Sequence, residues 1–318
     1  MAMNRVQFQS GVSLPEFYRQ FGTDAQCAQA LEQSRWPEGF RCPHCQHAAH
    51  YVIQGRRHKL FQCKACHRQT SLIVGTLFQS SHLPLSVWFL AIYLISEAKT
   101  GISALALKRK LGVSYPTAWL MHHKLMQAMT ERDEMYLLQG TIQVDDAYLG
   151  GELSGGKAGR GSENKVPFVA AASLDAKNHP VYLKLTPVPG FTLKAIADWA
   201  QQHLSPSSLV ISDGLACFAG VKEANCLHQP RVVGGKKPKD MPEFHWINTV
   251  LGNVKTSLSG THHAFAFGKY AARYLGAIAY RFNRRFKLDV LPQRLLMAAI
   301  GCTPRPESWL RRASEEAC

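Results

Sequence analysis

Two acidic side chains that could hold a divalent metal ion follow separate apolar runs of the sequence. Asp145 ends the run Thr141–Asp145, and Asp213 follows the run Ser208–Ser212, each of which predicts a strand. Carboxylates held side by side at the ends of neighbouring strands repel each other unless a cation lies between them. Mg²⁺ or Mn²⁺ suits such oxygen ligands, and two ions about 3.5–4 Å apart can assist an in-line displacement at phosphorus. The two aspartates therefore indicate metal-dependent phosphoryl transfer, with a turn-capping role as the plainer alternative.

A third metal ligand is expected on the helix that the sequence predicts from about Phe244 to Leu258. Asn248 has a side-chain oxygen that can contact a metal or a water molecule. Lys255 lies two helical turns further along the same face, where it could hold a DNA phosphate. Asn253 lacks this spacing to Lys255, so Asn248 is the better candidate, with capping of backbone amides as the alternative role.

Four cysteines form two C-x-x-C pairs near the start of the chain, Cys42 with Cys45 and Cys63 with Cys66. Each pair places two thiolates on one tight turn, and a hairpin between the pairs would bring the turns together as a tetrahedral Cys₄ site. Four sulfur ligands leave no open position on the metal. The spacing therefore predicts a zinc ion with a structural role.

The chain is strongly basic, with 37 Lys and Arg against 22 Asp and Glu and a net charge of +15. Such an excess favours a polyanionic partner, although charge alone also fits a basic protein that binds none. Basic residues give the expected zinc ribbon a face suited to a phosphate backbone, and those assigned to DNA binding are Arg56, Arg57 and Lys59.

Membrane and secretory classes are not expected from the sequence. No apolar run reaches the length of a membrane span, and the first residues lack a basic segment followed by an apolar one. Nine cysteines in such a chain indicate the reducing cytoplasm, where thiols bind metals or pack in cores. Those expected to be packing residues or free thiols are Cys217, Cys226, Cys302 and Cys318.

Helical periodicity follows the predicted ribbon, with helices expected at 85–98, 102–111 and 115–129. Gly112 suits the end of the second helix and Ser114 the N-cap of the third. Helix, glycine-containing turn and helix is the helix-turn-helix pattern, although any small helical bundle can show it. The residues of the third helix assigned to DNA binding are Tyr115, Trp119, His123 and Lys124.

The remaining pattern predicts three strands, a helix, a fourth strand and then helices, which suits an RNase H-like α/β fold. The expected fold is thus multidomain, α+β and α/β. Its predicted parts are a helical lead-in (1–38), a zinc ribbon (39–72), a helix-turn-helix module (83–132), an RNase H-like catalytic domain (140–290) and a C-terminal tail (291–318).

At these residues the chain resembles the bacterial insertion-sequence transposases of the DDE superfamily. The most similar group has a zinc ribbon and an Asp-Asp-Asn-Lys signature, the ISXO2-like transposase domain. The matching pieces lie across most of residues 40–290 and are the Cys₄ ribbon, VDDAYLGG at 144–151, SDG at 212–214, NTVLGNVK at 248–255, SGTHH at 259–263 and YRFNRRF at 280–286.

The resemblance implies that Asp145, Asp213 and Asn248 bind the catalytic metal, with Lys255 as their companion base. It also implies cleavage and strand transfer at the terminal inverted repeats of an element, joining to target DNA, no membrane partner and a homo-oligomer that holds two element ends. The expected location is the bacterial cytoplasm, in association with the nucleoid.

Two features depart from the usual family pattern. Asn248 stands where most DDE enzymes have Glu, so one ligand is neutral, and Asp146 stands where this group commonly has Glu. Two other functions stay open. The chain could be a DNA-binding regulator with a relict catalytic domain, or a metal-dependent nuclease that cuts without joining.

Overall fold

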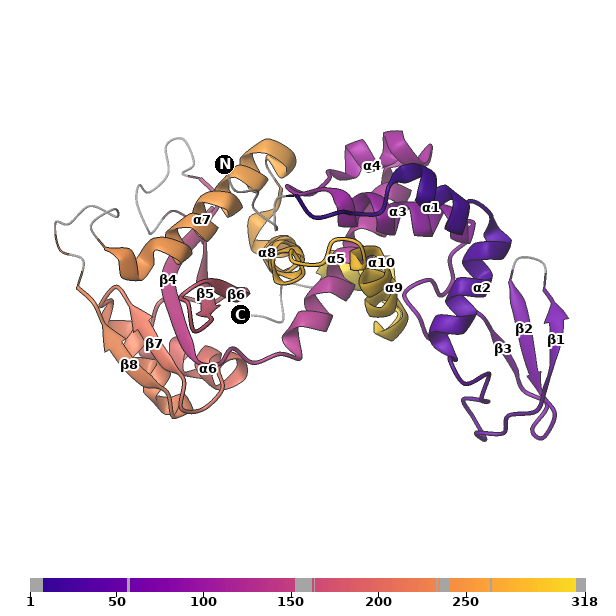
Figure 1. Ribbon diagram of the computed structural model, residues 1–318, viewed down its shortest axis with the longest axis horizontal. Coiled ribbons are helices and arrows are strands. Elements are labelled where there is room, and N and C mark those ends of the chain that lie inside the picture. Colours follow the sequence, from indigo (N-terminus) through magenta and orange to yellow (C-terminus); the bar gives the residue numbers. More distant parts are fainter. Residues whose placement is uncertain are drawn as a thin grey trace. The chain divides into compact units, whose positions relative to one another are not determined.

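The computed structural model describes residues 8–55, 58–151, 162, 164–232, 234, 241–263 and 265–312. The chain divides into two compact units (Figure 1). Unit 1 comprises Met1–Ala98, Ala104–Ala128 and Phe286–Pro306, and unit 2 comprises Lys99–Ser103, Met129–Arg285 and Glu307–Cys318. Of the helices in the described ranges, none combines the length and apolar character needed to cross a membrane.

Unit 1 begins with two helices, α1 (Leu14–Phe21) and α2 (Asp24–Arg35), which confirm a helical lead-in. A reciprocal capping box starts α2, because Thr23 and Gln26 each accept a hydrogen bond from the backbone N–H of the other. The ribbon follows as an antiparallel sheet of β1 (His50–Gln54), β2 (Lys59–Cys63) and β3 (Gln69–Ser71). The sequence predicted the first two strands but not the short third one.

Three helices follow the ribbon as expected: α3 (Leu85–Glu97), α4 (Ala104–Leu111) and α5 (Tyr115–Glu134). Gly112 ends α4 with φ +67°, and its N–H donates to the carbonyl of Lys108 at 3.0 Å. The Ser114 hydroxyl accepts from the N–H of Thr117 at 3.3 Å and thereby caps α5. The helices and the turn are confirmed, and their reading of DNA stays a prediction.

The expected C-terminal tail contains two further helices. Helix α9 (Leu291–Gly301) belongs to unit 1, where it contacts α3, and α10 (Glu307–Arg312) belongs to unit 2. The Leu77 N–H donates to the carbonyl of Ala299 at 3.0 Å. Residues 291–301 are therefore part of the unit 1 core and do not form an appendage.

Unit 2 is built on a five-stranded sheet in the order β6-β5-β4-β7-β8. The strands are β4 (Thr141–Leu149), β5 (Val166–Leu174), β6 (Pro180–Pro187), β7 (Leu209–Ser212) and β8 (Leu227–Pro230). The first three are antiparallel neighbours, whereas β4 with β7 and β7 with β8 are parallel. This is the strand order of the RNase H-like fold, which confirms the predicted fold class. Strand β8 was not predicted.

Helices cover both faces of this sheet (Figure 1). On one face, α6 (Leu193–His203) and a 3₁₀ helix (Ala216–Ala224) pack against residues such as Ile142 and Val144. On the other, α7 (His245–Ser257) and α8 (Phe267–Asn283) pack in a core that includes Leu149 of β4. Alternate residues of β4 therefore face different helical layers.

The motif at 280–286 closes the free edge of strand β6. The Asn283 side chain accepts from the Leu183 N–H at 2.7 Å and donates to the Leu183 carbonyl at 3.0 Å. Arg285 donates to the carbonyls of Val181 and Pro180. These side chains occupy hydrogen-bonding groups that an edge strand would otherwise present to another chain.

Candidate active site and zinc site

Three carboxylates converge at the centre of the unit 2 sheet. One oxygen from each of Asp145, Asp146 and Asp213 lies within 4.8 Å of the other two, and all three residues are half-buried. Strand β4 pairs with β7 only as far as Gln143, so the edge of β4 beside Asp145 is open where Asp213 follows the end of β7. The strand order thus confirms the predicted meeting of Asp145 and Asp213.

Local hydrogen bonds orient two of these carboxylates. Asp145 Oδ1 accepts from the N–H of Asp146 at 2.9 Å, and Asp213 Oδ1 accepts from the N–H of Leu215 at 3.0 Å. Gly214 turns the chain between Asp213 and Leu215 with φ +89°, and a Cβ there would lie 3.2 Å from the Val232 side chain. The turn therefore requires glycine.

The donor set fits a divalent cation. Oxygen ligands are those that Mg²⁺ and Mn²⁺ prefer, and three carboxylates this close need a positive charge between them. The site assignment from sequence left Asp146 out, although the residue stands inside the VDDAYLGG motif. Side chains of neighbouring residues on a strand point to opposite faces, so the sequence pattern does not predict that Asp145 and Asp146 share a site.

Helix α7 lies against β4, as the predicted third ligand requires. The N–H of Ile247 donates to Gln143 Oε1 at 3.1 Å, so the start of α7 is tied to β4 two residues before Asp145. Asn248 and Lys255 are exposed on α7, and a Cβ on Gly252 between them would have no heavy atom within 4 Å. Their approach to the carboxylates stays a prediction.

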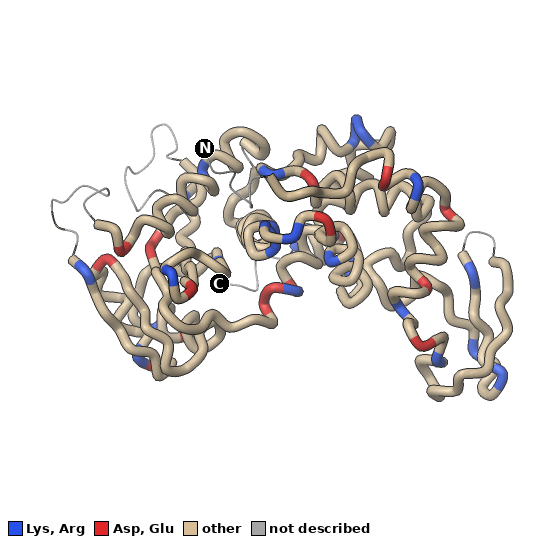
Figure 2. The backbone as a smooth tube through the Cα atoms, viewed as in Figure 1, with Lys and Arg blue, Asp and Glu red and all other residues tan. Residues whose placement is uncertain are grey.

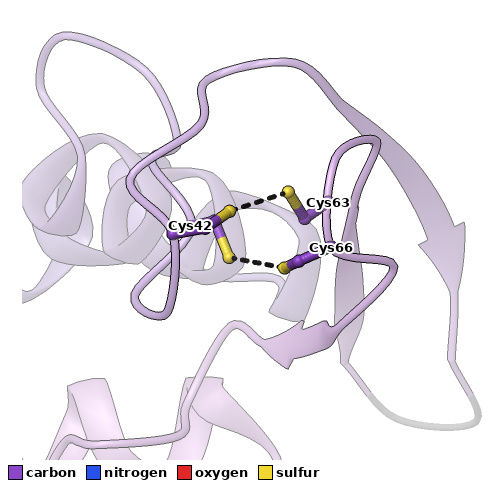
Figure 3. Close-up of side chains that lie close together, drawn as sticks. Cys42, Cys63 and Cys66 are labelled. Atoms are coloured by element: carbon purple, nitrogen blue, oxygen red, sulfur yellow. Dashed lines mark hydrogen bonds between the residues drawn. The ribbon is translucent and has the colours of Figure 1, made fainter.

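The four predicted cysteines meet in the ribbon of unit 1, where each Sγ lies within 4.8 Å of the others. Cys42 Sγ is 3.5 Å from Cys66 Sγ, and Cys45 Sγ is 3.5 Å from Cys63 Sγ. Figure 3 shows Cys42, Cys63 and Cys66 with their side chains directed toward one another. A tetrahedral ion with Zn–S bonds of about 2.3 Å separates its sulfurs by about 3.8 Å. The cluster therefore fits zinc.

Two matching turns build this cluster. The N–H of Gln46 donates to the carbonyl of Cys42 at 2.8 Å, and the N–H of His67 donates to that of Cys63 at 3.1 Å. Gln46 and His67 both have positive φ, at 61° and 57°. In the first turn, N–H groups directed at the Cys42 sulfur, chiefly that of Cys45, lower the pKa of the Cys42 thiol to about 6. This favours the thiolate at Cys42. At Cys45 the His47 N–H acts to lower the pKa, but burial and the neighbouring sulfurs together raise it to about 12.

Two family models match these two regions. The description "ISXO2-like transposase domain" matches residues 137–283, and "Transposase zinc-ribbon domain" matches residues 22–69. Together they cover more than half of the chain. The chain thus carries an ISXO2-like transposase domain and a transposase zinc-ribbon domain.

A curated relative from Halobacterium salinarum carries the description "Uncharacterized protein in transposable element ISH50". It is 28% identical over 233 residues, which are 68% of this chain and 76% of the relative.

Among solved structures, a pre-cleavage Mos1 transpososome is 10% identical with a TM-score of 0.25, covering 66% of this chain and 76% of that one. The Mos1 strand transfer complex is also 10% identical, with a TM-score of 0.26, covering 68% and 79%. These similarities are too weak for comparing sites residue by residue.

The residues that the sequence assigned to DNA binding lie in different environments. Tyr115, at the start of α5, is 48% exposed, and Trp119 is half-buried. Lys59 is half-buried and forms an ion pair with Glu32 at 2.9 Å. Arg56 and Arg57 lie outside the described residues.

Two of those assignments are wrong for this structure. His123 has no exposed surface and its ring lies 4.1 Å from that of Trp119. Lys124 is 9% exposed, and its ammonium donates to the carbonyl of Leu77 at 3.3 Å. Residues 121–126 are all buried, so the middle of α5 has no solvent-facing side.

Sequence reasoning passed over a basic group at the end of α4. Lys108, Arg109 and Lys110 are consecutive and all exposed. Figure 2 shows this run of positive charge on α4. The run of three basic residues was visible in the sequence, but such runs are also common on solvent-exposed helix faces that bind nothing.

Proposed function

We propose that the protein is a DNA transposase that cuts DNA at the ends of its element and joins those ends to target DNA in the presence of Mg²⁺ or Mn²⁺. The observation that supports this most directly is the convergence of Asp145, Asp146 and Asp213 within the domain that matches the transposase family. The match to the family alone would also fit a relict regulator. A decayed enzyme has little reason to retain three carboxylates within 4.8 Å.

In this proposal Asp145, Asp213 and Asn248 hold the divalent ion, with Asp146 beside them. A bound ion supplies Lewis acidity toward a phosphodiester. The protein's own residues supply position. The Leu215 N–H fixes the Asp213 carboxylate, and the Lys255 ammonium holds a phosphate of the DNA strand next to the carboxylates.

The ribbon contributes DNA contacts, and zinc stabilises the fold of the ribbon. Cys42, Cys45, Cys63 and Cys66 bind the ion in a closed site, so its role is structural. Zinc binding of about 10–16 kcal/mol supplies most of the folding free energy of so small a module.

DNA is contacted by unit 1 in this proposal, through the basic run on α4 and the exposed start of α5. Lys108, Arg109 and Lys110 bind phosphates, and Tyr115 and Trp119 lie where the second helix of a helix-turn-helix meets base edges. Lys59, Arg56 and Arg57 contribute to binding by the ribbon. Two element ends must be held together, so the active form is a homo-oligomer, and chromosomal DNA places it at the nucleoid in the cytoplasm.

A cleavage and strand-transfer assay tests the proposal. Purified protein is incubated with labelled duplex that carries the element's ends, with Mg²⁺ or with EDTA. Asp213→Ala is compared with Asp198→Ala, which removes an exposed carboxylate from α6 of the same unit. Joined products that need the metal and vanish only in Asp213→Ala support the proposal.

Other products would point to the other functions. DNA binding without cleavage in either metal condition indicates a regulator. Metal-dependent cleavage without joining indicates a nuclease.

A further inference from the structure

A buried polar side chain on β4 has no role in the proposed chemistry so far. Gln143 is 3% exposed and lies two residues before Asp145. Its Oε1 accepts the N–H of Ile247 on α7 at 3.1 Å. Burying an amide away from water is unfavourable without such a partner, so a glutamine at this buried position has a reason beyond packing.

The hydrogen bond takes the place of a helix cap. The first four N–H groups of a helix have no acceptor within the helix, and α7 begins at His245, so Ile247 is in this first turn. The residue before α7, Phe244, offers no side-chain cap. Gln143 therefore caps α7 from a strand about 100 residues earlier in the chain.

This cap lies on the same face of the sheet as the Asp145 carboxylate. Gln143 and Asp145 are two residues apart on one strand, so their side chains point to one face. Their partners across the ladder, Ala172 and Ala170, both pack in the core that contains Ile247. This hydrogen bond thus ties the first turn of α7 to the strand that carries Asp145.

We propose that Gln143 is a positioning residue for the metal site. It fixes the first turn of α7 and so holds Asn248, the residue next to Ile247, at a set place relative to the Asp145 carboxylate. This rests on the proposed function, because Asn248 must be a metal ligand for its position to matter. The consequence is that Gln143 sets the affinity for the divalent ion without touching it.

Two substitutions at position 143 separate the hydrogen bond from side-chain size. Gln143→Met keeps the length and removes the acceptor, whereas Gln143→Glu keeps an acceptor that also suits a helix N-terminus. Ser173→Ala is the matched control, because Ser173 is 3% exposed and its hydroxyl accepts the Tyr182 N–H elsewhere in the same sheet. Thermal melting establishes that each full-length variant is folded.

Mn²⁺ binding to the full chain is measured by calorimetry, beside DNA cleavage. Residues that orient metal ligands typically change affinity or activity by about 10–100-fold. We expect Gln143→Met to lose about that much Mn²⁺ affinity, and Gln143→Glu and Ser173→Ala to stay within about threefold of the wild type. Wild-type affinity in Gln143→Met overturns the inference, as does an equal loss in Gln143→Glu.

A double-mutant cycle with Asn248→Ala separates this inference from the function on which it rests. If Gln143 acts through Asn248, adding Gln143→Met to Asn248→Ala causes no further loss of Mn²⁺ affinity. A further loss as large as in the wild type overturns the inference while leaving Asn248 as a ligand. If Asn248→Ala itself binds Mn²⁺ and cleaves DNA normally, the assignment of Asn248 in the proposed function is wrong, and the inference falls with it.

Discussion

The carboxylate of Asp133 joins the end of α5 to the end of α8 in unit 2. Its Oδ1 forms an ion pair with Arg284 Nη2 at 2.8 Å, and its Oδ2 accepts a hydrogen bond from Asn283 Nδ2 at 2.8 Å. The Asp133 and Arg284 side chains are only 11% and 9% exposed. Replacing Asp133 with alanine would therefore leave a buried guanidinium without its counter-charge.

The expected loss of stability follows from this burial. Removing one partner of a buried ion pair costs about 3–5 kcal/mol, because the remaining charge stays desolvated. Arg284 also lies 3.5 Å from the centre of the Tyr280 ring, and that cation–π contact survives the substitution. We therefore expect Asp133→Ala to lower the free energy of unfolding of unit 2 by about 3 kcal/mol, the lower end of the range.

Calorimetry of the full chain measures this loss. In a domain of about 150–250 residues each kcal/mol moves Tm by about 2–4 °C, so the transition of unit 2 should fall by about 6–12 °C. Asp198→Ala, an exposed change in the same unit, should stay within about 0.5 kcal/mol of the wild type.

A double substitution tests the cause. Asp133→Ala with Arg284→Met removes both charges, so it should recover most of the lost stability. A fall in Tm of less than about 2 °C in Asp133→Ala, or no recovery in the double variant, would refute the reasoning.

Three further predictions concern zinc, the sheet edge and pH. Cys45→Ser should unfold the ribbon, seen as lost amide dispersion in NMR spectra, and leave the unit 2 transition unmoved. Asn283→Ala leaves both backbone groups of Leu183 without their partner, so calorimetry should show a loss of about 2 kcal/mol or more. Burial, then the Lys184 charge, lowers the pKa of His203 to about 4 from 6.5, so the unfolded chain binds this proton more readily. The contribution of His203 to the free energy of unfolding should be full above pH 6.5 and fall by up to about 3 kcal/mol toward pH 4. His203→Gln should remove this pH dependence in urea unfolding.

Local patterns were sufficient for the zinc site and for most elements, but not for the short strands β3 and β8 or for helices α9 and α10. Each C-x-x-C pair specifies its own turn, and Gly112 with Ser114 marks the break between α4 and α5. The strands that carry Asp145 and Asp213 are also local, because alternation and length identify them. These features depend on neighbours within a few residues, which a sequence displays directly.

Helical periodicity failed on α5 because it identifies faces but not what covers them. His123 and Lys124 were assigned to DNA, yet the helix is buried on every side from 121 to 126. The sequence offered no sign that Lys124 donates to the carbonyl of Leu77, 47 residues away. Similarly, residues 291–301 were set aside as a tail, although α9 packs in the core of unit 1.

The sequence by itself determined which chemistry this protein can hold: four thiolates at zinc spacing, and aspartates at the ends of two strands in a basic chain. Tertiary structure decided which groups share a site. It brought Asp146 into the carboxylate cluster, placed Gln143 as the cap of α7 and closed the edge of β6 with Asn283. The physical reason is that these contacts join residues on different strands and helices, and their geometry comes from strand order and helix packing, which no local pattern encodes.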